Sequence, residues 1–174
     1  MAYQKLQAGR AIAVVPSDDF NVPNPAATAA SGTTTADGRA TNQLIQAGAT
    51  FLTDNIKAGD IIYAGTSIVE PTIAATVVSV LNDTTINVEN STGGAASAFN
   101  TALEYTIFSQ ADNPQNGCCL FIGDISGGGR VKVNMAAGDD TVNFRGLVAG
   151  QFLPINVLRV WATDTTAAEI VALW

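Results

Sequence analysis

The chain has 174 residues, of which 47% are hydrophobic and 13% are charged. This length is enough for a buried core in one domain or in two small ones, and the low charged content is unusual for a free cytosolic enzyme. The formal net charge of −7 argues against a nucleic-acid-binding protein, because phosphate contacts need clustered Lys and Arg, and the chain has 8 in all. No apolar run is long enough to span a bilayer and residues 1–5 lack the apolar segment of a secretory signal, so we expect no membrane partner.

The N-terminal part of the chain predicts one short strand and a long arm. Ala11 to Val15 is apolar and is stopped by Pro16, so it is expected to be a strand. Residues 17–40 contain Asp18-Asp19, two prolines and then mostly small side chains, which indicates an extended loop. Such an arm lies either on a neighbouring subunit, where contact offsets its ordering entropy, or on the surface of its own chain.

Residues 41–110 carry a second set of short apolar or alternating runs. Asn82-Asp83 separates two β-branched runs, which predicts a hairpin, and close spacing of strands and turns is typical of a small closed barrel. The boundaries at about Ala40 and Asp112 fall in polar or Gly/Pro-rich stretches, which favours a barrel-like domain inserted into another sheet. The expected strands are Gln43–Gln46, Thr50–Thr53, Asp60–Ala64, Ile73–Leu81, Thr85–Glu89 and Glu104–Ser109.

Residues 117–174 read as an antiparallel sheet, because short apolar runs alternate with Gly, Asp and Thr clusters. Residues 131–135 and 142–144 alternate between apolar and polar side chains around a turn and predict a hairpin. Residues 152–161 are apolar at both odd and even positions, which predicts a central strand covered on both faces. The final run, residues 170–174, is expected to be a strand that holds Trp174 against the sheet.

Candidate chemical groups are few. The chain has no histidine, which removes the commonest general base and the Cys/His and Ser/His mechanisms. Cys118 and Cys119 are adjacent and are expected to be reduced thiols that pack in the sheet. The pairs Asp18-Asp19 and Asp139-Asp140 could serve a hydrolase or a calcium site, but aspartate is also favoured in turns by its backbone hydrogen bonds. We therefore expect no catalytic residue, no metal site and no cofactor.

Large aromatic residues are the candidate binding residues. Trp161 and Trp174 could form a platform for a sugar, although such residues near strand ends more often fill a core or a subunit interface. We assign both to an interface, together with Phe20 of the arm.

Both ends of the chain carry a resemblance. The ending FLPINVLRVWATDTTAAEIVALW resembles a signature in small virion structural proteins of tailed bacteriophages and related gene-transfer particles. The opening AYQKLQAGRAIAVVPSDDFNVPNP also resembles these proteins, particularly versions from phages of marine cyanobacteria. The runs GDIIY, AATVVSV, TTINV and YTIFS resemble an extra barrel-like module of some members. Asp164 stands where many members have glycine, which is expected to alter only a turn.

Together these observations predict an all-β protein. An antiparallel β-sandwich is expected from residues 1–40 and 111–174, with an extended N-terminal arm and an inserted β-barrel-like domain at residues 41–110. The resemblance implies a non-enzymatic virion component, a capsid decoration, cement or spike-base protein that forms homo-oligomers and contacts other virion proteins such as the major capsid protein. The alternative is a tail or neck appendage that binds a receptor or a glycan.

Overall fold

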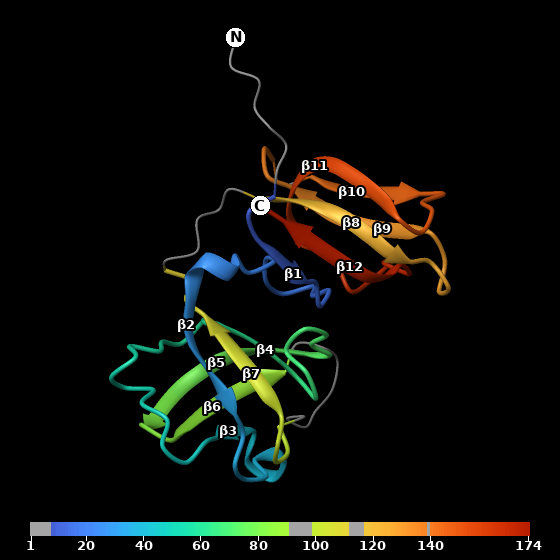
Figure 1. Ribbon diagram of the computed structural model, residues 1–174. Helices are drawn as coiled ribbons and strands as arrows, with labels where there is room; N and C mark the ends of the chain where they lie inside the picture. Colours follow the sequence, from blue (N-terminus) through green and yellow to red (C-terminus); the bar gives the residue numbers. More distant parts are fainter. Residues whose placement is uncertain (1–7, 91–98, 112–116, 139) are drawn as a thin grey trace.

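The computed structural model describes residues 8–90, 99–111, 117–138 and 140–174. It confirms the all-β prediction, with two antiparallel sheets of which one is curled into a half-barrel. Figure 1 shows the two sheets one above the other, with β1 on the side of the upper sheet that faces the half-barrel. In the described residues, no helix has the length and hydropathy needed to cross a membrane.

Sheet A is the upper sheet and combines the two ends of the chain (Figure 1). Its buried side chains alternate along each strand, so that Leu120 and Ile122 lie on the same face as Val131 and Val133. The expected hairpin is confirmed, since Val133 pairs with Val142 across it. The strands follow the order β1 (Ala11–Ala13), β12 (Ala168–Leu173), β8 (Cys118–Asp124), β11 (Gln151–Val160), β9 (Arg130–Met135) and β10 (Thr141–Arg145).

Strand β11 joins two halves of sheet A. Its first residues pair with β8 and its last residues pair with β9, with register shifts after Leu153 and after Val157. The side of β11 that β8 leaves free is taken by the N-terminal arm, because Ser17 N donates to Val160 O (2.9 Å) and Val22 N donates to Leu158 O (2.8 Å). Residues 17–22 of the arm therefore lie on their own chain and not on a neighbouring subunit.

Sheet B is the half-barrel. Its two edge strands approach each other where Thr35 N donates to Ile45 O (2.9 Å), which draws the sheet toward closure. Its inner face holds a core with Phe51, Phe99 and Tyr105. The strands follow the order β2 (Thr28–Thr33), β7 (Glu104–Phe108), β4 (Ile61–Gly65), β5 (Ile73–Asn82), β6 (Thr85–Asn90) and β3 (Gln43–Ile45).

Two predictions for the first half of the chain are wrong. Residues 17–40 are not a single extended loop, because they contain a short 3-10 turn, Pro25–Ala27, and strand β2, which pairs with β7. Sheet B therefore begins at Thr28, before the expected boundary near Ala40. Residues 50–53 are not a strand, because residues 51–55 form a turn in which Asp54 N donates to Thr50 O (2.7 Å). Strand β2 was not expected because its residues are small, and the strand expected at residues 50–53 rested on a single apolar pair, Phe51-Leu52.

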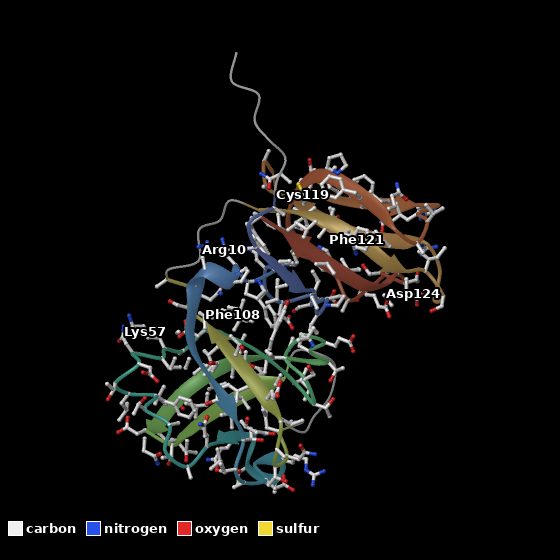
Figure 2. All side chains as sticks on the ribbon, in the orientation of Figure 1. Arg10, Lys57, Phe108, Cys119, Phe121 and Asp124 are labelled. Carbon is white, nitrogen blue, oxygen red and sulfur yellow. The ribbon has the colours of Figure 1, made fainter. Side chains whose placement is uncertain are left out.

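The two sheets meet through a small shared cluster. Val15, between β1 and the arm, is buried against Ile61 and Tyr63 of β4 and Phe108 of β7. Figure 2 shows Phe108 on the side of sheet B that faces β1. Strand β4 is buried along its whole length, because Ile62 and Ala64 face the barrel core while Ile61 and Tyr63 face the arm.

Candidate interaction surfaces

An apolar row crosses the outer face of sheet A. The register places Ala13 beside Val171, Val171 beside Phe121, and Phe121 beside Phe152. These residues alternate with the buried Leu120 and Ile122 set, so they point away from the core. Phe121 is 36% exposed and Phe152 is 39% exposed. With strands about 4.8 Å apart, the row is roughly 14 Å wide.

A second row extends this surface. Ala11 pairs with Leu173 and Leu173 pairs with Cys119 on the same face, and none of these side chains is charged. Figure 2 shows Cys119 and Phe121 along β8. We call the combined surface the apolar face; it consists of Ala11, Ala13, Cys119, Phe121, Phe152, Val171 and Leu173.

A groove borders the apolar face on the side of the half-barrel. It has a volume of about 530 Å³, with Phe121 and Val171 on one side and residues 69–72 on the other. Val69, in the loop between β4 and β5, is 75% exposed. Glu70 and Glu169 supply the charged rim of the groove. A partner that fills it would bury apolar side chains from both sheets.

The apolar face changes one sequence prediction. Residues 152–161 were expected to be covered on both faces, but Phe152 and Pro154 are exposed. Two features therefore explain why apolar residues occupy both odd and even positions of β11. At its start the strand carries part of an exposed apolar face, and later the register shifts change which side chains point to the core. Sequence reasoning did not assign Phe121 or Phe152 to a site, although apolar side chains at both parities were the available signal.

Trp161 lies outside the apolar face, beside cationic side chains of β9 and β11. Lys132 Nζ is 4.6 Å from the ring centroid, Arg159 Cζ is 5.6 Å from it, and the indole N–H donates to Asn134. Arg159 also donates to Asp18 O (2.9 Å). Trp161 thus contacts both β9 and β11, and Arg159 ties this cluster to the arm within one chain.

Asp18 and Asp164 complete this cluster around Trp161. Thr163 N donates to Asp18 Oδ1 (2.9 Å), and the side-chain hydrogen bond from Thr163 is the main reason why the pKa of Asp18 is lowered. Asp164 lies 3.7 Å from Lys132 Nζ and has a positive φ of 71°, a conformation that glycine adopts freely. Asp164 therefore lies in a left-handed turn.

The other two predicted interface residues also have contacts within the chain. Trp174 packs on the sheet A core, and its backbone N donates to Arg10 O (3.0 Å). Phe20 packs against the cluster shared by the two sheets. Trp174 and Phe20 are both half-buried, and their assignment to an interface between subunits stays a prediction.

A small polar crevice of about 150 Å³ lies beside sheet B. The Tyr105 hydroxyl donates to Gln46, and Thr50 Oγ1 donates to Asp54 Oδ2 (2.9 Å). Burial raises the pKa of Tyr105 to about 12, so its hydroxyl stays protonated at neutral pH. The crevice offers hydrogen-bond donors and acceptors, but Phe51 at its base is fully buried and gives no aromatic platform.

The remaining candidate groups have structural contacts. Burial raises the pKa of the Cys118 thiol to about 12, and Cys118 Sγ lies 3.4 Å from Val157 O. Asp19 lies in a turn held by the Ser17 side chain, whose Oγ accepts from Asp19 N (3.0 Å). Asp139 lies outside the described residues. Within the described part of the chain, no group of three or more Cys, Asp or Glu residues is arranged to hold a metal ion.

Comparison with protein-family models, with curated proteins and with solved structures finds no match to this chain.

Proposed function

We propose that this protein is a non-enzymatic structural component of a phage particle, a capsid decoration, cement or spike-base protein in the virion. It acts through contacts with copies of itself and with the major capsid protein. The proposal is supported by the resemblance of both ends of the chain to small virion proteins and by the absence of histidine from the whole sequence.

The apolar face is the observation that carries the proposal. Phe121 and Phe152 are side by side and more than a third exposed. Covering the exposed part of each ring would contribute about 2 kcal/mol at about 25 cal/mol per Å². A continuous, uncharged apolar surface on a protein that otherwise buries its core is typical of an interaction site.

The occupant that fits this face is the capsid surface. The face spans the adjacent strands β1, β12, β8 and β11, and the groove beside it can receive a protruding loop. A cement protein needs such a surface, since it must bind an already folded shell without a chemical reaction. The apolar face of the decoration protein would then lie toward the shell.

The test compares binding to particles assembled without this chain. The double variant Phe121→Ser/Phe152→Ser removes the exposed rings and should weaken the affinity of the protein for the particle at least about a hundredfold. Val78→Ser is the matched control, because Val78 is 50% exposed but lies on β5, away from the apolar face. Equal binding by both variants, with both folded, would contradict the proposal.

The polar crevice supports a second candidate, a tail or neck appendage that binds a glycan. Gln46, Asp54 and Tyr105 present the kinds of groups that bind sugar hydroxyls. A glycan array distinguishes the two functions. Specific binding that is lost in Asp54→Asn and retained in Phe121→Ser/Phe152→Ser would favour the appendage.

A further inference from the structure

We infer that copies of this chain associate head to tail, with the edge of sheet A in one copy against the tip of the half-barrel in the next. The inference rests on the proposed function, which requires self-association, and it names the surfaces that meet. The two surfaces are the arginine edge, formed by Arg130, Arg145 and Val148, and the barrel tip, formed by Leu52, Asp54, Leu81 and Asp83.

The arginine edge contains an unfavourable pair. Arg145 on the edge strand β10 lies directly opposite Arg130 on β9 in the antiparallel register. Like charges in this position destabilise a sheet. No carboxylate of the described residues lies within 4.0 Å of either guanidinium to offset the repulsion. The pair is therefore set up to receive an anionic group from outside the chain.

Backbone contacts fix the arginine edge in place. Leu147 N donates to Gly129 O (3.1 Å), which holds the loop after β10 against the residue before Arg130. A side chain at Gly129 would collide with the Leu147 carbonyl, so this close approach requires glycine. Val148 in this loop is 58% exposed, which adds an apolar contact beside the two cations.

The barrel tip has the opposite charge and its own exposed apolar side chains. Leu52 N donates to Asp83 Oδ1 (3.1 Å), which joins the 50–55 turn to the turn between β5 and β6. Leu52 is 57% exposed and Leu81 is 51% exposed. Asp54 and Asp83 are also exposed. Each surface thus combines large apolar side chains with charges that match those of the other.

The composition of sheet B makes it the anionic part of the chain. Setting aside the ion pair between Asp37 and Arg39, its only basic side chain in residues 28–108 is Lys57. Against it stand Asp54, Asp60, Glu70, Asp83, Glu89 and Glu104. The half-barrel as a whole, and not only Asp54 and Asp83, should therefore attract the arginine edge of another copy.

The two surfaces lie at opposite ends of the molecule. Strand β5 starts at the cluster shared by the sheets, where Ala74 is buried, and runs away from it to Asn82 at the barrel tip. Strand β10 is at the edge of sheet A opposite β1, which faces the barrel (Figure 1). Surfaces at opposite ends cannot meet within one copy. Between copies they form a heterologous contact, which closes into a ring if the rotation allows.

Charge reversal and complementation test this contact. Arg130→Glu/Arg145→Glu should be monomeric under conditions in which the wild-type chain associates, and so should Asp54→Lys/Asp83→Lys. Mixing the two variants should restore association, because each retains one natural surface and gains one reversed surface. Raising the salt from about 0.05 M to about 0.5 M should weaken wild-type association at least about tenfold. Analytical ultracentrifugation measures all of these states.

Two further variants keep the result interpretable. Asp54→Lys/Asp83→Asn keeps a side-chain oxygen that can accept from Leu52 N–H, which controls for any disturbance of the turn by Asp83→Lys. Arg39→Glu/Lys57→Glu makes the same change of net charge as the arginine-edge variant and should still associate, since it leaves the arginine edge intact.

The outcomes separate this inference from the proposed function. If both charge-reversal variants associate as well as the wild-type chain, the head-to-tail contact is wrong. The apolar face is then the contact to be tested. A monomeric wild-type chain overturns this inference and the self-association in the proposed function. Loss of nucleic-acid binding, and not of self-association, in the arginine-edge variant would assign Arg130 and Arg145 to a phosphate ligand and also overturn the inference.

Discussion

The Tyr63 hydroxyl of sheet B bridges the backbone of Val15, which follows β1: it accepts from Val15 N (3.4 Å) and donates to Val15 O (3.3 Å). Tyr63 is fully buried, and its ring packs edge-on against Phe108 with centroids 5.8 Å apart. The backbone N–H and C=O of Val15, which follows β1 of sheet A, are therefore both paired by a side chain of sheet B. We therefore expect the two sheets to unfold as one unit.

Replacing Tyr63 by phenylalanine tests that dependence. Tyr63→Phe leaves the Val15 backbone without its buried partner and should lower the free energy of unfolding by about 1–2 kcal/mol. Tyr105→Phe is the matched control, because its hydroxyl bonds to Gln46 beside an open crevice where water can replace it. Denaturant titration of both variants measures the difference; equal losses would show that the bridge to Val15 has no special role.

The shared cluster also predicts one cooperative transition for the whole chain. Phe108→Ala leaves a cavity between the sheets and should cost about 3–5 kcal/mol. Hydrogen exchange should then accelerate in β12 and in β6 together, although neither strand contains the mutation. Faster exchange confined to β6 would show instead that the half-barrel unfolds separately from sheet A.

Trp174 provides a third prediction. Its side chain packs on the sheet A core, and its carbonyl accepts from Gly9 N (2.6 Å). Trp174→Ala should remove about 3–5 kcal/mol, a large fraction of the stability of an ordinary domain. Thermal unfolding checks this. Trp161→Ala is the comparison: Trp161 lies on the polar surface of the sheet, and its loss should lower the melting temperature less.

The pH dependence of stability follows from the shifted groups. Burial raises the pKa of Cys118 and of Tyr105 each to about 12, and it also raises the pKa of Tyr63. Because the folded pKa values exceed the ordinary values of 9.0 and 10.0, the stabilisation is complete below pH 9 and falls as pH rises toward 12. Melting temperatures measured across this range should decline, and a flat profile up to pH 12 would contradict the burial of these groups.

The acid side has the opposite sign. Hydrogen bonds from Thr163, Arg39 and Ser126 lower the pKa of Asp18, Asp37 and Asp124 below the ordinary value of 3.8. Their contribution is present above that value and is lost as pH falls below it, and it should be small because these carboxylates are largely exposed. Since the chain has no histidine, stability should be nearly constant between about pH 5 and 8.

The sequence predicted the strands that alternate or contain β-branched runs, including both hairpins, because side-chain periodicity directly reflects which face is buried. Strand β2 was not predictable in this way: TAASGT has no large side chain, and it is a strand because it pairs with β7. The apolar face was equally hidden. Phe121 and Phe152 come from strands distant in sequence, and only the register shows that they are neighbours.

The location and orientation of the chain on a purified phage particle test the central claim most directly. A reconstruction by electron cryomicroscopy is predicted to show ordered density for the protein at regular capsid positions, with Phe121 and Phe152 against the shell. Particles that do not contain the chain, or that carry it with these two rings facing solvent, would contradict the account.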